Sequence, residues 1–260
     1  MTALLVSACA VLGLIVGSFL NVVIWRVPRG ESVVSPGSAC PACGHAIRAW
    51  DNVPVLSWLL LRGRCRDCGA GISVRYPLVE LGTGLLFASL AWQFGFSWAL
   101  PAFLYFAGIA IALSLIDLDT KRLPNVIVLP SYAVAAALLL VPALAYGAWP
   151  QYLHALAGAV ALFAFYFVLA WIYPAGMGFG DVKLAGVLGL YLGWLGWGPL
   201  IVGAFAGFAI GAVVGVILIA ARRAGRKTGI PFGPFMLLGA LIAVFAGDPL
   251  ADVYLNLVGI

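Results

Sequence analysis

Long runs of apolar residues alternate with short polar breaks along most of the chain. Runs of about 17–25 apolar residues can cross the hydrocarbon core of a bilayer as helices. The sixth and eighth runs are short and rich in glycine. The pattern predicts an all-α polytopic membrane protein with about eight transmembrane helices. These runs lie near residues 2–24, 78–96, 98–117, 125–146, 152–173, 182–195, 197–221 and 233–247.

The composition agrees with this pattern. Hydrophobic residues make up 64% of the 260 residues, charged residues make up 9%, and the mean hydropathy is +1.12. A soluble domain of this size is far less apolar. The first run looks like a secretory signal, but no basic segment precedes it and no convincing cleavage site follows. We therefore predict three parts, which are a first transmembrane helix (1–25), a polar module (26–77) and a multi-helix membrane domain (78–260).

The basic residues divide the loops into two classes. With the amino terminus outside, all 14 Lys and Arg residues fall on the cytoplasmic side, where positive charge is favoured. The opposite loops, near 95–97, 147–151 and 194–198, carry no charge. The net charge of +5 thus reflects membrane orientation and predicts no nucleic-acid partner. The cytoplasmic groups are Arg26, Arg29, Arg48, Arg62, Arg64, Arg66 and Arg75, then Lys121 and Arg122, then Lys183, and finally Arg222, Arg223, Arg226 and Lys227.

The polar module contains four cysteines in two C-x2-C-G motifs, Cys40 to Gly44 and Cys65 to Gly69. This spacing is typical of zinc ribbons, and four thiolates close a tetrahedral site, so the metal is expected to be structural. Two disulfides are the alternative, which a reducing cytosol disfavours. We interpret His45, beside the first motif, as a surface residue and Cys9 as a packing residue. The predicted zinc ligands are Cys40, Cys43, Cys65 and Cys68.

Two aspartates lie where apolar runs meet polar loops. Asp117 ends the third run and Asp181 precedes the sixth, so both fall at the cytoplasmic boundary. Ionisable groups at membrane depth are costly and mark functional sites. Two carboxylates at equal depth can hold a water and share a proton, so that one is a base while the other donates to a scissile carbonyl. The sequence therefore predicts aspartic proteolysis by Asp117 and Asp181.

Each aspartate also has a structural interpretation. Asp181 would cap the helix that follows it, and Asp117 would pair with Lys121 or Arg122. Asp119 lies further into the polar loop, and we interpret it as solvated. The shared membrane position of Asp117 and Asp181 favours the catalytic interpretation over these two.

Four further residues are candidates for the substrate path. The glycines Gly178 and Gly180 precede Asp181 and allow an extended peptide to approach closely. Lys183 follows Asp181, and Glu80 enters a helix just after Arg75. Glu80 either faces the site or pairs with Arg75, and the local sequence leaves both open.

Seven motifs follow one another across nearly the whole chain. They are Gly17-Ser-Phe-Leu-Asn-Val-Val-Ile-Trp-Arg-Val-Pro28, the two cysteine motifs, Trp50-Asp-Asn-Val-Pro54, Arg75-Tyr-Pro-Leu-Val-Glu80, Leu115-Ile-Asp-Leu-Asp119 with Leu123-Pro-Asn125, Gly178-Phe-Gly-Asp181 and Ile230-Pro-Phe-Gly-Pro234. Each motif alone is modest, but their ordered combination is specific, and it resembles that of bacterial type IV prepilin peptidases.

The resemblance implies an aspartic endopeptidase of the bacterial inner membrane. Such enzymes cut after a Gly in the basic leader of type IV prepilins and type II secretion pseudopilins, at the cytoplasmic face. Asp117 and Asp181 match the catalytic aspartates of the family, and the four cysteines match its cytoplasmic zinc module. Many members also N-methylate the new amino terminus with S-adenosylmethionine. Membrane lipid is a further expected partner.

The chain departs from its relatives in two places. The stretch from Pro28 to Cys40 is short, and Asn125 stands where Asp is frequent. A glycine-rich cofactor loop of the Rossmann type is not found, so the residues that bind the methyl donor are unknown. Gly17, Asn21 and Glu80 are weak candidates, and close helix packing explains Gly17 and Asn21 at least equally well. The Ile230–Pro234 motif is expected to form a non-helical entry to the last helix.

Two other classes of protein remain open at this stage. A proton-coupled transporter would use Asp117 and Asp181 as a proton relay, but it favours midplane carboxylates and internal repeats. A zinc-bearing scaffold without chemistry would leave the two carboxylates unexplained.

Overall fold

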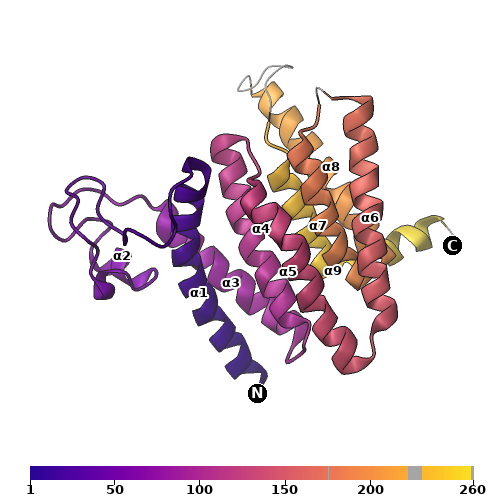
Figure 1. Cartoon of the computed structure of the whole chain (residues 1–260), viewed down its shortest axis with the longest axis horizontal. Coiled ribbons are helices and arrows are strands. Elements are labelled where there is room, and N and C mark those ends of the chain that lie inside the picture. Colours follow the sequence, from indigo (N-terminus) through magenta and orange to yellow (C-terminus); the bar gives the residue numbers. More distant parts are fainter. Residues whose placement is uncertain (175, 222–229, 259–260) are drawn as a thin grey trace. The chain divides into compact units, whose positions relative to one another are not determined.

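The structure is a computed structural model that describes residues 1–174, 176–221 and 230–258 (Figure 1). Arg222, Arg223, Arg226 and Lys227, the fourth predicted basic loop, lie outside the described residues. Within them, the only β pairing consists of two isolated bridges. The helices are α1 (Thr2–Arg26), α2 (Leu56–Leu60), α3 (Arg75–Phe94), α4 (Leu100–Thr120), α5 (Asn125–Tyr146), α6 (Trp149–Ile172), α7 (Phe179–Leu195), α8 (Trp197–Ala220) and α9 (Gly233–Val258), with 3-10 turns η1 (Val27–Arg29) and η2 (Ala49–Asp51).

The predicted all-helical membrane fold is confirmed, but the predicted number of spans is too high. Each of the eight apolar runs overlaps one long helix. In the described part of the chain, only six helices are long and apolar enough to cross a membrane, namely α1, α4, α5, α6, α8 and α9. Helix α3 begins with Arg75 and includes Glu80. Helix α7 has 17 residues, so it extends only about 26 Å, less than the hydrocarbon core of about 30 Å.

The last helix is longer than predicted. We expected it to end near residue 247, before the polar tail. Helix α9 instead continues through Pro249 to Val258. Asp248 and Asp252 are exposed along it, so the acidic side chains reach solvent without ending the helix.

The described residues form two compact units, and each is considered by itself. The first consists of Met1–Leu100 with Ala107–Ala112. Within it, α1 packs along α3 (Figure 1). The contact is close because glycines line it: a Cβ added at Gly17 would lie 2.7 Å from the Cα of Glu80. Small residues allow membrane helices to approach in this way.

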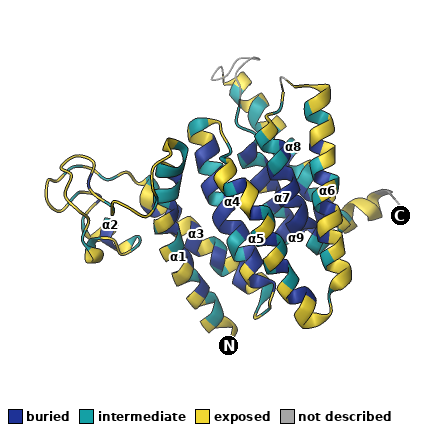
Figure 2. Ribbon diagram, viewed as in Figure 1, coloured by how far each residue is buried: buried dark blue, intermediate teal, exposed yellow. Residues whose placement is uncertain are grey.

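The second unit consists of Pro101–Phe106 with Leu113–Ile260, and α7 is its central helix. Helix α7 packs against α5, α6, α8 and α9, and Val182 and every residue from Leu184 to Gly193 are buried (Figure 2). Because neighbouring helices surround α7, its short length does not leave polar backbone facing lipid. On α6, Gly158 faces Gly189 of α7, and a Cβ on either glycine would meet the backbone carbonyl of the other. The site residues Asp117 and Asp181 both belong to this second unit.

Candidate active site and metal centre

The two cysteine motifs fold into two turns of the same kind. In the first, the Gly44 N–H donates to the Cys40 carbonyl, and in the second the Gly69 N–H donates to the Cys65 carbonyl. Gly44 and Gly69 have φ values of +71° and +72°. This left-handed conformation costs glycine little, which explains why each motif ends in Gly. Each turn therefore presents its two thiols on one side.

The four cysteine sulfur atoms come together as the spacing predicted. All four Sγ atoms lie within 4.8 Å of one another, and the Sγ atoms of Cys40 and Cys68 are 3.8 Å apart. In a tetrahedral site with Zn–S bonds of about 2.3 Å, neighbouring sulfurs are also separated by about 3.8 Å. The cysteines are free rather than paired in disulfides. The donor set thus fits a closed, structural zinc site, while His45 is exposed and outside the group.

Backbone donors favour the thiolate form of Cys40, whereas burial and the neighbouring thiols raise the pKa of Cys68 to about 12. Hydrogen bonds from the backbone of Cys43 and Ala42 lower the pKa of the Cys40 thiol to about 7. A metal ligand must be deprotonated, so the fold of the first turn prepares Cys40 for coordination.

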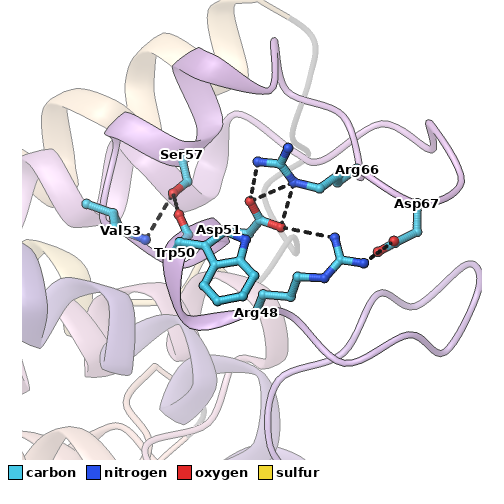
Figure 3. Close-up of polar contacts among 7 residues, drawn as sticks. All are labelled: Arg48, Trp50, Asp51, Val53, Ser57, Arg66 and Asp67. Carbon is cyan, nitrogen blue, oxygen red and sulfur yellow. Dashed lines mark hydrogen bonds and ion pairs between the residues drawn. The ribbon is translucent and has the colours of Figure 1, made fainter.

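Charged side chains tie the second cysteine turn to the segment between the two turns (Figure 3). Arg66 lies inside the turn, and its Nη2 and Nε donate to Asp51 at 2.6 and 2.9 Å. Arg48 donates to Asp67 of the same turn at 2.8 Å. The hydrogen bonds from Arg66 hold the pKa of Asp51 below its usual value. The Trp50–Pro54 motif thus has a role in the module that sequence reasoning did not assign.

A second set of contacts links the module to α3. The Glu80 carboxylate is buried and accepts a hydrogen bond of 2.7 Å from the Val55 N–H, where α2 begins. Val55 has a φ of +62°, an unfavourable value for a β-branched residue. Glu80 is therefore an anchor that stabilises this strained turn, which explains its position without a role in substrate binding.

Asp117 lies in the last turn of α4, with 4% of its surface exposed. Its Oδ2 accepts a hydrogen bond of 3.1 Å from the Gly233 N–H, at the start of α9. Among the described residues it forms no ion pair, so the alternative pairing with Lys121 or Arg122 is not seen. The Ile230–Pro234 motif, predicted to be structural, thus contacts the first aspartate directly.

Asp181 lies in the first turn of α7, where its Oδ2 accepts a hydrogen bond of 3.1 Å from the Gly178 N–H. The predicted capping role of Asp181 is therefore realised. This contact occupies only one carboxylate oxygen, so capping and chemistry are compatible. The second oxygen has no hydrogen bond in the described part of the chain.

Leu123 lies between the surroundings of the two aspartates. A Cβ added at Gly180 would lie 3.3 Å from the Cβ of Leu123, and one added at Gly233 would lie 3.3 Å from its Cδ2. Gly180 precedes Asp181, while Gly233 binds Asp117, so one leucine side chain joins both neighbourhoods. The structure thus places the surroundings of both aspartates that the sequence singled out beside one leucine side chain.

Lys183 has a different environment from Asp181. Its Nζ donates to Asn125 Oδ1 at 3.0 Å and lies 4.9 Å from the centre of the Phe179 ring. An Asp at position 125 would supply a counter-charge, whereas Asn supplies only a neutral acceptor. Lys183 therefore forms no ion pair with the residues that the structure describes, and its charge lies on the side of α7 next to α5.

The weak candidates for a methyl-donor site have structural contacts in the first unit. Gly17 packs against the backbone of Glu80. The Asn21 amide donates to the Tyr76 carbonyl at 3.2 Å. These contacts join α1 to α3, in agreement with the packing interpretation.

Comparisons with known proteins agree with this geometry. The family model of the bacterial peptidase A24 N-terminal domain matches residues 11–94, and that of the type IV leader peptidase family matches residues 104–220. A prepilin leader peptidase/N-methyltransferase of Pseudomonas aeruginosa is 39% identical, covering 95% of this chain and 92% of its own. Proteins of the same name from Stutzerimonas stutzeri (38% identical, 95% and 93% covered) and Neisseria gonorrhoeae (39%, 94% and 91%) are also similar. No solved structure matches significantly. The chain belongs to the type IV leader peptidase family.

Proposed function

We propose that this chain is a prepilin leader peptidase that cleaves after Gly in the basic leader of type IV prepilins and type II secretion pseudopilins. The observation that supports the proposal is that Leu123 lies beside both Gly180, next to Asp181, and Gly233, which binds Asp117, in a chain that matches named prepilin peptidases over 94–95% of its length. Nothing in the relatives supports the proton-coupled transporter.

The two carboxylates supply the elements of aspartic peptide hydrolysis. One carboxylate, ionised, removes a proton from a water held between them, and the water oxygen bonds to the scissile carbonyl carbon. The other, protonated, donates to the carbonyl oxygen. When the intermediate collapses, a hydroxyl proton returns to the second carboxylate, the C–N bond breaks, and the new amine takes up the proton that the first carboxylate removed from the water. Because the two carboxylates interact, their titration belongs to the pair.

The candidate substrate path has two kinds of residue. Gly178 and Gly180 border Asp181 and leave room for an extended backbone. Lys183 places its charge beside α5, so it would act on acidic groups of a substrate rather than on its basic leader. Glu80 is held by Val55, which favours an anchoring role over its earlier assignment to this path.

The basic leader has few acidic partners in the module. Asp51 and Asp67, two of the three candidates, already pair with Arg66 and Arg48. Glu31 remains, and we infer that membrane lipid supplies further negative charge. We assign the chain to the bacterial inner membrane as a multi-pass protein, with the aspartates and the cysteine module facing the cytoplasm. The sorting of the basic residues supports this orientation.

We further propose that Cys40, Cys43, Cys65 and Cys68 hold one structural Zn²⁺. The separation of their sulfur atoms and the free thiols support this assignment. With four thiolate ligands no position is open for substrate or water. The ion would therefore stabilise the module without taking part in hydrolysis.

N-methylation with S-adenosylmethionine is the second proposed activity, and it rests on the names of the relatives. Gly17, Asn21 and Glu80 do not fit a methyl-donor site, because their contacts are those of helix packing and of module anchoring. We therefore place no donor site at them and derive no methyl-transfer step.

The test of the peptidase is cleavage of purified prepilin by the full chain in liposomes. Asp117→Asn and Asp181→Asn should each abolish cleavage while helicity and zinc content stay unchanged. Asp119→Asn is the matched control, since it removes a neighbouring carboxylate of the same type. Cleavage at the normal rate by either dyad variant would refute the assignment.

A further inference from the structure

At the start of α9, one backbone N–H binds a side chain from another helix. The first N–H groups of a helix have no partner within it. Here the N–H groups of Phe235 and Met236 both donate to the Phe232 carbonyl, and Pro234 has no N–H. The Gly233 N–H is left, and it donates to Asp117 Oδ2 at 3.1 Å. Of the residues from Gly233 to Met236, only Gly233 thus has an N–H that binds outside the helix start, and its acceptor is the carboxylate.

Asp117 needs this donor more than Asp181 does. Asp117 lies in the last turn of its own helix, α4, where the helix dipole disfavours negative charge. Asp181 lies in the first turn of α7, where the dipole favours it. The amino terminus of α9 supplies Asp117 with the favourable dipole and the backbone donor that Asp181 obtains from the start of its own helix. Each carboxylate is then held through one oxygen by a glycine N–H, from Gly233 and Gly178 respectively.

The same contact requires glycine at position 233. A Cβ there would lie 2.7 Å from Asp117 Oδ2, whereas ordinary contacts begin at 3.4 Å. The carboxylate would have to move about 0.7 Å, the difference between these distances. The Phe232 ring packs among the rings of Tyr166, Phe208 and Phe235, which fixes the residue just before Gly233. These ring contacts therefore help to hold the donor in place.

We propose that Gly233 is the positioning residue of Asp117: its backbone N–H fixes Oδ2 and leaves Oδ1 for the water that attacks the substrate. This inference rests on the proposed peptidase function. It adds a third element, the start of α9, to the two helices that carry the aspartates.

Kinetics of the full chain in liposomes with purified prepilin test the role. Gly233→Ala should lower kcat at least about 100-fold, the cost expected of a displacement approaching 1 Å, and should change KM less than about threefold. Gly207→Ala is the matched control. Its Cβ would press on the backbone of Phe235 and Met236 in the first turn of α9, at 3.2–3.5 Å, without touching Asp117. The control should retain kcat within about threefold.

A normal kcat in Gly233→Ala, or an equal loss of kcat in both variants, would overturn the proposal. Failure of the peptidase proposal gives a different result, because Asp117→Asn would then cleave normally. The two outcomes are therefore distinguishable.

A spectroscopic measurement covers the case in which Gly233→Ala does not fold. The chain has three Phe-Gly pairs, which end in Gly95, Gly180 and Gly233. Labelling with carbonyl-13C phenylalanine and 15N glycine therefore selects three N–H signals by NMR. Asp117→Ala should move the Gly233 proton upfield, because its hydrogen bond is lost, and should leave Gly95 unchanged. A Gly233 signal that does not move would contradict the contact.

Discussion

The cysteine module and the aspartate site are both held by contacts between residues distant in sequence, but they are held by different means. In the module, four thiols and two Arg–Asp clusters join loops with little regular structure. In the bundle, buried helices place Asp117 and Asp181, and each carboxylate receives a backbone N–H. The module thus depends on side-chain chemistry, whereas the aspartate site depends on helix packing.

This difference determines which changes destabilise each region. The module has few buried apolar residues, so loss of the proposed zinc ion should remove its main source of stability. The bundle has a large apolar core and tolerates loss of a polar contact, but it does not tolerate a change in the distance between helices. The following four changes should separate the two regions.

Removal of the metal should have the largest effect, and it should be confined to the module. Structural zinc contributes about 10–16 kcal/mol in small zinc domains. Cys40→Ser with Cys68→Ser should lose zinc and expose Arg62, Arg64 and Arg66 to trypsin, while circular dichroism shows that the bundle keeps its helices. Atomic emission measures the zinc.

Cys9→Ala is the control for that experiment, because Cys9 is a buried cysteine of α1 outside the metal cluster. It should keep one zinc per chain. A module that resists trypsin without metal would show that its charged contacts are sufficient.

A methyl group between α6 and α7 should have the next largest effect, and it should be confined to the bundle. In Gly189→Ala the Cβ meets the backbone of Gly158 and Ala159. Overpacking costs about 1–3 kcal/mol, so thermal unfolding in detergent should begin at a lower temperature while zinc is retained. Gly215→Ala is the control, since its Cβ has no neighbour within 4 Å. An unchanged unfolding temperature in Gly189→Ala would show that the helix pair can separate freely.

The predictability of the two regions follows from the same difference. Cysteine spacing predicted that the four thiols come together because each turn is local, and apolar runs predicted the helix positions because burial in lipid depends on length. The count of spans was too high because α3 carries charged residues near its start and α7 is short and enclosed by other helices, and apolar runs alone do not distinguish lipid from protein surroundings.

The role of Gly233 was missed for a physical reason. The group that binds Asp117 is the backbone N–H of Gly233. Every residue except proline has such a group, so the amino-acid type does not indicate which backbone N–H binds a side chain. The one available signal was Phe-Gly-Pro before an apolar run, since Pro removes one helix donor and Gly leaves space beside another. Likewise, Glu80 was ambiguous because its partner is the backbone of Val55, 25 residues away.

Loss of the hydrogen bonds between Asp51 and Arg66 should destabilise the module less than loss of the metal does. Asp51→Asn should lower the temperature at which the module releases zinc, measured with a zinc-sensitive dye, because the charge-assisted bonds to Arg66 are weakened. Glu31→Gln is the control and should not change this temperature. Release at the same temperature in Asp51→Asn would show that the thiols alone hold the module.

The pH dependence of that difference follows from the lowered pKa of Asp51. A carboxyl with a lowered pKa in the folded state stabilises the fold above its ordinary pKa of about 3.9, and this contribution is lost as pH falls through the folded value. The difference in zinc-release temperature between wild type and Asp51→Asn should therefore stay constant from about pH 6 to about pH 8. A gap that varies across this range would implicate a different group.

The smallest expected effect is a gain of stability in the bundle from Asn125→Asp. Asn125 is the first residue of α5 and accepts from Lys183 at 3.0 Å. A carboxylate there would face a helix amino terminus and an ammonium group, which together contribute about 0.3–1 kcal/mol at an exposed site. The unfolding temperature should rise slightly, and the rise should shrink in high salt because exposed charges are screened. Asn125→Ala should lower the unfolding temperature. A rise in Asn125→Asp that persists in high salt would show that the gain is not electrostatic.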